Sequence, residues 1–253
     1  QNVSDVFFCS TFAPRNQPAL HYAFAPTMSQ TSHSTSEVST PLDKEKQESI
    51  LEQVNKLFMR HGIKSMTMDD VANHLHISKK TLYQFVTDKN DLVERSMSRM
   101  HCQHTGIIDS ICTQGLNAID EQLEITKYLA TLLSQVHPSI HYDLEKYHPK
   151  AWQQFNEEKR SHIYDCMTQN MRKGMKEGLY RDDLKADIVA KLYLSRFDVI
   201  FDGELFPVDK YSFSDVTWES FRYHMRGIAS DKGLKYLEKK TKNPRCHRLK
   251  RDD

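Results

Sequence analysis

The stretch TMDDVANHLHISKKTLYQFVTDKNDL, residues 67–92, decides how the rest of the chain is interpreted. Thr67 is placed to cap a helix, and Asp69 and Asp70 follow in its first turn, where carboxylates stabilise the positive end of the helix dipole. Apolar residues then recur at helical spacing, and Ser78 is placed to cap a second short helix. Two short helices joined by a three-residue turn are typical of a helix-turn-helix.

The second predicted helix carries residue types that suit a DNA major groove. Polar side chains lie near its start, the end of a recognition helix that usually contacts the bases; these are Lys79, Lys80, Thr81 and Gln84. Tyr83 offers a hydroxyl to phosphate oxygens, which set the register of a complex without reading its sequence. On spacing alone, an ordinary helical hairpin with a solvated basic face explains the pattern equally well.

The run from Gly62 to Val93, with the helix before it, resembles the DNA-binding domain of the tetracycline-repressor (TetR) family of bacterial regulators. The residues that match at the family's spacing are Phe58, Gly62, Thr67, Ile77, Ser78, Thr81, Leu82, Tyr83, Lys89 and Leu92. This resemblance implies an all-α protein with an N-terminal three-helix head that binds DNA and a C-terminal helical bundle that binds a ligand and dimerises.

The DNA-binding face is assigned from the motif and the resemblance together. The residues expected to contact the duplex are Thr67, Ser78, Lys79, Lys80, Thr81, Tyr83, Gln84, Phe85 and Lys89. One pair departs from the family, which usually has two aromatic residues after the tyrosine, the second a phenylalanine. Here the pair is Phe85-Val86, so we expect looser local packing and no polar contact of the kind that a histidine or tyrosine makes.

Composition limits the class of protein. The 253 residues can bury a sizeable core in one or two domains, and 35 basic against 34 acidic residues give a net charge of +1. A nucleic-acid surface must therefore be local. Five scattered cysteines without a CxxC pair suit a reducing cytoplasm, and no apolar run approaches the roughly 18 residues of a membrane span. We expect a cytoplasmic, all-α protein without a membrane partner.

Four regions are expected along the chain. Residues 1–42 form an N-terminal extension that is disordered or foreign to the native protein, with Met28 as the natural start. Residues 43–92 form the helix-turn-helix domain, and residues 93–237 form the effector-binding and dimerisation domain. Residues 238–253 form a basic, disordered tail.

The body is expected to be a helical bundle. A long helix that begins after Asp88 connects it to the head, and its last two helices are expected at about 186–206 and 214–237. The resemblance implies that these two pair with their copies in a second subunit. Candidate interface residues are Tyr193, Phe197, Phe201, Phe221 and Met225, and candidate effector-binding residues are Trp152, Phe155, Met167 and Met171. Ordinary intrachain core explains each of these residues as well.

Catalytic and metal-binding patterns are weak. No Ser/His/Asp signature, phosphate-binding glycine loop or pair of catalytic carboxylates is recognisable, so we expect no enzyme and no cofactor. Three neighbouring donors, His101, Cys102 and His104, do not converge on one helix face, and the histidines between residues 137 and 148 offer no tetrahedral set. We expect no metal.

The resemblance therefore implies a homodimeric, ligand-responsive transcriptional repressor. An apolar or amphipathic small molecule of unknown identity would release it from a palindromic double-stranded DNA operator. Two alternatives stay open. One is a helical regulator that acts through protein contacts without DNA, which the departure at Phe85-Val86 allows. The other is a small metal-dependent helical enzyme that uses the histidines near residues 137–148.

Overall fold

The computed structural model describes residues 44–241, and the predicted extension (1–42, with Met28) and the tail from residue 242 onward lie outside them. This part of the chain is all-α, as predicted. Its helices are α1 (Lys44–His61), α2 (Met68–His74), α3 (Lys79–Phe85), α4 (Lys89–Cys112), α5 (Ala118–Leu133), α6 (Ile140–Tyr147), α7 (Pro149–Lys176), α8 (Ala186–Ile200), α9 (Phe213–Ile228) and α10 (Asp231–Thr241).

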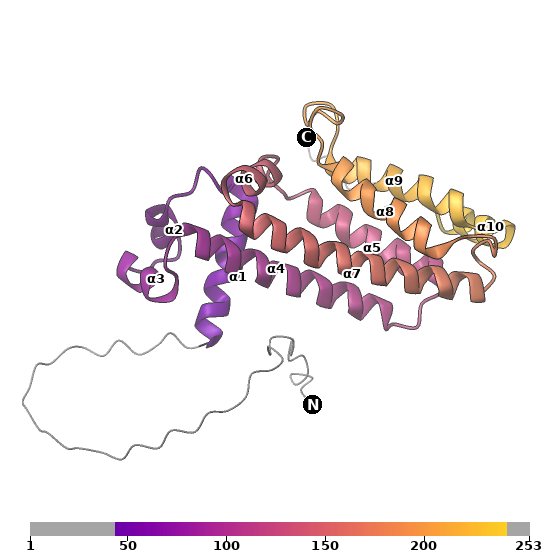
Figure 1. The fold of residues 1–253 in the computed structure, drawn as a ribbon, viewed down its shortest axis with the longest axis horizontal. Coiled ribbons are helices and arrows are strands. Elements are labelled where there is room, and N and C mark those ends of the chain that lie inside the picture. The colour runs from indigo at the N-terminus through magenta and orange to yellow at the C-terminus, as the bar shows by residue number, and fades with distance from the viewer. Residues whose placement is uncertain (1–43, 242–253) are drawn as a thin grey trace, which may run out of the picture. The chain divides into compact units, whose positions relative to one another are not determined.

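The first three helices form a head at one end of the described residues (Figure 1). Their apolar stripes meet in a core that contains Val54 and Phe58 of α1, Leu82 of α3 and Leu92 of α4. A polar pair fixes α1 against α4, because the Asn55 side-chain amide donates to the Ser96 carbonyl oxygen at 2.9 Å. The long helix α4 thus begins inside the head core.

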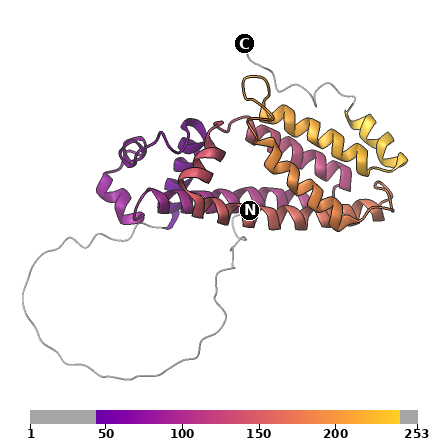
Figure 2. The same ribbon diagram turned by 45° about the horizontal axis from the view of Figure 1, so that its top comes forward.

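The remaining helices form a bundle with a second core. Helix α4 runs along α7, α5 packs against α7 and α9, and α8 packs against α7 and α9 (Figures 1 and 2). Ile119, Met171, Tyr180 and Met225 are among its buried residues. The Tyr180 hydroxyl donates to the Asn170 side-chain oxygen at 2.8 Å, so the polar end of this buried ring is satisfied.

The last helices end earlier than the sequence predicts. Helix α8 stops at Ile200 rather than near residue 206, because the Asp202 carboxylate accepts from the backbone amides of Glu204 and Leu205, at 2.9 and 3.0 Å, and turns the chain. The predicted helix 214–237 is in fact two helices. Ala229 is extended and pairs with Tyr180 in an isolated antiparallel bridge, which breaks the helix between α9 and α10.

The predicted disordered tail also begins too early. Helix α10 continues to Thr241, so residues 238–241 are helical. The Lys240 ammonium lies 3.1 Å from the Asp120 carboxylate of α5, which ties the end of α10 to the bundle.

A buried carboxylate on α6 joins the head to the bundle. Asp143, only 4% exposed, accepts from the backbone amides of Ile63 and Lys64 at 3.0 and 2.9 Å. The neighbouring Gly62 has φ +82°, and a Cβ there would lie 2.7 Å from the Ser139 hydroxyl oxygen. A glycine is therefore needed both for the left-handed turn and for the close approach of α6.

We expect Asp143→Ala to destabilise the protein by about 1–3 kcal/mol, because the buried Ile63 amide loses its acceptor. Urea unfolding followed by circular dichroism measures the change. Glu145→Ala is the matched control, since it removes an exposed carboxylate from the same helix. Equal stability of the two variants would show that Asp143 does not hold the head.

Candidate functional site

Helices α2 and α3 are each started by a local capping interaction. The Thr67 hydroxyl accepts from the Asp70 amide at 3.1 Å, and the Asp70 carboxylate accepts from the Thr67 amide at 2.9 Å. The Thr67 hydroxyl also donates to the Asp70 carboxylate at 2.6 Å, and this bond and the one from the Thr67 amide hold the pKa of Asp70 below its usual value. The Ser78 hydroxyl accepts from the Thr81 amide at 2.9 Å, and His76 between the helices has a left-handed φ of +52°. The predicted helix-turn-helix is present.

One face of α3 is polar and open to solvent. Its exposed side chains are those of Lys79, Lys80, Tyr83 and Gln84, with Ser78 at the cap and Thr81 half-buried. The Lys79 ammonium lies 2.8 Å from the Asp69 carboxylate of α2, which raises the pKa of Lys79. The structure thus gathers most of the predicted contact residues on one surface, around a helix short enough to enter a groove.

Lys89 lies apart from this face, at the start of α4. Its side chain is half-buried, and its ammonium is 3.5 Å from the Lys64 carbonyl oxygen. Burial lowers the pKa of Lys89, against the attraction of the Asp143 and Asp70 carboxylates. A backbone phosphate would therefore reach it only at the edge of the head.

Phe85 is not on the exposed face, in contrast to the prediction. Its side chain is 7% exposed and belongs to the head core, and the Arg95 guanidinium lies over its ring at 5.3 Å from the ring centroid. The next residue, Val86, is also buried in this core. The aromatic ring at position 85 therefore contributes to packing in this structure and is not available to a duplex.

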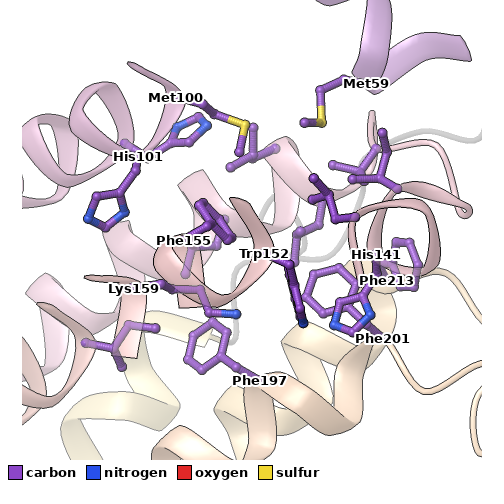
Figure 3. Close-up of a pocket in the computed structure, with 18 of the residues that line it drawn as sticks. Met59, Met100, His101, His141, Trp152, Phe155, Lys159, Phe197, Phe201 and Phe213 are labelled. Carbon is purple, nitrogen blue, oxygen red and sulfur yellow. The ribbon is translucent and has the colours of Figure 1, made fainter. Parts of the chain in front are cut away.

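A cavity of about 180 Å³ lies in the bundle, bordered by α4 to α8, by Met59 of α1 and by Phe213 of α9. Trp152 and Phe155 form part of its wall (Figure 3). Met167 and Met171, which the sequence grouped with them, lie instead in the second core, where Met171 is fully buried. Both methionines lie further along α7. The apolar residues of that helix therefore line the cavity near its start and pack in the second core near its end.

The titratable groups in the cavity wall are all basic. They are His101, His104, His137, His141, His162 and Lys159, and no Asp or Glu is among the lining residues. Burial lowers the pKa of His101, His104 and His141, which favours their neutral form at pH 7.

Lys159 is the charged group of this wall. Its ammonium points into the space beside Trp152 and Phe155 (Figure 3), at 5.4 and 5.6 Å from the two ring centroids. Burial lowers the pKa of Lys159, and the attraction of Asp198 opposes that shift. The charge of Asp198 is shared with Arg160, since the two side chains lie 2.7 Å apart.

The residues predicted to form a dimer interface face the chain's own interior. Phe221 and Met225 are buried in the second core, and the Tyr193 ring lies 4.7 Å from the His224 ring. Phe197 and Phe201 line the cavity. Phe221 and Met225 are therefore interior residues of the chain, whereas the half-buried Tyr193, Phe197 and Phe201 leave an interface at those positions a prediction.

Other apolar side chains of α8 and α9 are exposed. On α8 these are Ile188, Leu192 (62% exposed) and Val199, which share one helix face, and on α9 Tyr223 is 81% exposed. The spacing of the α8 residues was visible in the sequence, but periodicity does not tell which of two apolar stripes faces outward. Among the described residues, no helix is long and apolar enough to cross a membrane.

Comparisons with known proteins agree with this arrangement. The profile of the family described as "Bacterial regulatory proteins, tetR family" matches residues 50–95. The uncharacterized HTH-type transcriptional regulator YvaF of Bacillus subtilis (strain 168) is 22% identical over 186 residues, which are 72% of this chain and 95% of the relative.

Solved structures of regulators share the fold. A TetR-family regulator from Agrobacterium tumefaciens matches with a TM-score of 0.60 and 14% identity, over 74% of this chain and 99% of that one. A putative regulator from Saccharomonospora viridis in complex with choline has a TM-score of 0.59 and 18% identity, over 74% and 100%.

A third similar structure is FadR from Bacillus subtilis in complex with stearoyl-CoA, with a TM-score of 0.57 and 14% identity over 73% and 100% of the two chains. The proteins to which this chain is similar are transcriptional regulators rather than enzymes. Residues 50–95, which contain the helix-turn-helix, thus match the TetR family of bacterial regulatory proteins, and the described helices share the fold of solved regulators.

Proposed function

We propose that this protein is a cytoplasmic homodimeric repressor that binds a palindromic operator and releases it when a small amphipathic anion occupies the cavity. The observation that carries the proposal is the connection between two sites by one helix. Helix α4 begins in the head, shortly after α3, and continues into the cavity wall, to which it contributes Met100, His101 and Ile108. Movement of α4 against the bundle would move the head.

The proposed duplex contacts divide by chemistry. Lys80 and Gln84 are exposed on α3 and carry groups that hydrogen-bond to base edges. The Tyr83 hydroxyl and the Lys89 ammonium would contact phosphates, which position the head without reading sequence. Two copies of α3 would enter successive major grooves, about 34–36 Å apart along the duplex.

Replacing Lys80 or Gln84 with alanine should relax base preference at one operator position and cost about 1–3 kcal/mol there. Lys89→Ala should instead weaken binding to all sequences and lower the salt slope by about 1. Selection from a random duplex library followed by anisotropy titrations measures both effects. Lys176→Ala, an exposed lysine on α7, is the charge-matched control. Selection of an unchanged operator by Lys80→Ala would exclude base reading by that lysine.

The proposed dimer uses the outward faces of α8 and α9. Ile188, Leu192, Val199 and Tyr223 form an exposed apolar set on these two helices. Pairing of α8 and α9 with their copies would bury the set in a four-helix interface, as contiguous exposed apolar side chains favour. Phe221 and Met225 would pack on the inner side of these helices and hold the interface residues in place.

We expect Leu192→Glu to be monomeric in light scattering, because a carboxylate would be buried without a partner in the interface. Its operator affinity should fall steeply, since the second half-site would no longer bind intramolecularly. Gln169→Glu, which adds a carboxylate to an exposed position on α7, should remain dimeric. A dimeric Leu192→Glu protein would rule out this face.

The cavity supports an anionic effector. Desolvating an ammonium is costly unless an opposite charge compensates it, and the cavity wall provides none to the half-buried Lys159. A ligand carboxylate would supply that charge, while the aromatic wall would contact an apolar body. The cavity's volume is close to that of an engineered protein cavity of about 150 Å³ that binds benzene. A single ring or a short acyl chain would therefore fit. Regulators with this fold are known with stearoyl-CoA and with choline, and Lys159 favours the anion over the cation.

We expect the protein to bind a carboxylate such as benzoate or hexanoate about 10-fold or more tightly than the neutral alcohol with the same skeleton, which corresponds to about 1.4 kcal/mol. Calorimetry measures this preference, which Lys159→Met should abolish and Lys159→Arg should keep. Adding the carboxylate ligand should also release the protein from its operator DNA. Equal affinity for acid and alcohol would contradict the anionic effector without affecting the assignment of the DNA-binding face.

A further inference from the structure

Three side chains of metal-ligating type, Asp109, His162 and Cys166, converge between α4 and α7, with the thiol of Cys112 beside them. Asp109 and Cys112 are three residues apart on α4, and His162 and Cys166 are four residues apart on α7, so each pair lies on one face of its helix. Because α4 and α7 pack along one another, the two faces meet. The predicted function uses none of the four residues as a group.

The donor atoms are already close together. The His162 Nε2 atom lies 2.9 Å from the Asp109 Oδ1 atom and 3.5 Å from the Cys166 Sγ atom. One donor atom from each of these three residues lies within 4.8 Å of the other two. A tetrahedral zinc site has bonds of about 2.0–2.3 Å, which place its ligand atoms roughly 3.3–3.8 Å apart. Small side-chain movements would therefore bring the three donors onto one ion.

A second sulfur borders the same set. The Cys112 thiol lies beside that of Cys166, and neither is in a disulfide. Among the described residues, the set of Asp109, His162 and Cys166 is the one group of three such donors that converges. Asp109 is exposed and the other three residues are half-buried, so an ion would have a path from solvent.

We propose that Asp109, His162, Cys166 and Cys112 bind a divalent transition-metal ion, with Zn²⁺ as the best fit. Two thiolates, an imidazole and a carboxylate form a donor set that excludes Mg²⁺ and Ca²⁺ and suits a borderline ion in tetrahedral geometry. The ion would bridge α4 and α7. It would stabilise their contact by mass action, and because His162 also lines the cavity, it would fix one residue of the effector site.

Cobalt titration of the full chain, kept reduced with a phosphine, tests the proposal. We expect one Co²⁺ per chain, a thiolate-to-cobalt charge-transfer band and the intense ligand-field bands of tetrahedral coordination, all lost when Zn²⁺ is added. Cys166→Ser and Asp109→Asn should weaken binding by more than the roughly 10–100-fold that loss of an outer-shell partner costs. Cys112→Ser should reduce the charge-transfer band, since one of two sulfurs is lost.

Cys102→Ser is the matched control, because Cys102 is an exposed thiol on the same helix and outside the set. It should bind cobalt like the wild-type chain, and circular dichroism checks that each variant is folded. The proposal is overturned if the reduced wild-type chain takes up no cobalt, or if folded Cys166→Ser gives the wild-type spectrum. A full charge-transfer band in Cys112→Ser would remove Cys112 from the ligand set. None of these readouts depends on DNA binding.

Discussion

The structure depends on one buried carboxylate that bonds to a loop of the head. Asp143 accepts from two consecutive backbone amides between α1 and α2, and those amides have no helical partner of their own. The same eight-residue helix also contributes Ile140, His141 and Leu144 to the cavity wall. Helix α6 therefore contacts both the head and the cavity, and a ligand that displaced it would strain these hydrogen bonds.

Helix α4 provides a second connection between the same regions. Its first turns carry Leu92 and Met97 into the head core, its middle lines the cavity, and its last turns carry Asp109. Since close-packed interiors move between discrete arrangements rather than deform continuously, α4 and α6 would shift together. A ligand biases such a change only through its different affinities for the two arrangements, so the proposed release from DNA would require a cavity that differs between them.

Sequence reasoning succeeded where the signals are local. The capping residues Thr67 and Ser78 and the polar face of α3 depend on neighbours within four positions, and the structure has them as predicted. It failed where the outcome depends on distant partners. Periodicity identified Met171 and Phe221 as apolar positions but could not tell cavity, core and interface apart, because all three require the same stripe. The break at Ala229 comes from its pairing with Tyr180, about 50 positions away in the chain, and the Asp109–His162 pair is equally remote.

The chemistry of the cavity adds a constraint that packing alone does not explain. A bundle of this kind could fill the space beside Trp152 with an aliphatic side chain at no electrostatic cost. Instead, an ammonium lies there against two aromatic faces, and the carboxylate that attracts it, Asp198, is paired with Arg160. Cation–π contacts offset only part of the desolvation of such a charge. Residues that lower the stability of a fold are concentrated at functional sites. The position of Lys159 is therefore best explained by a ligand whose negative charge compensates its ammonium.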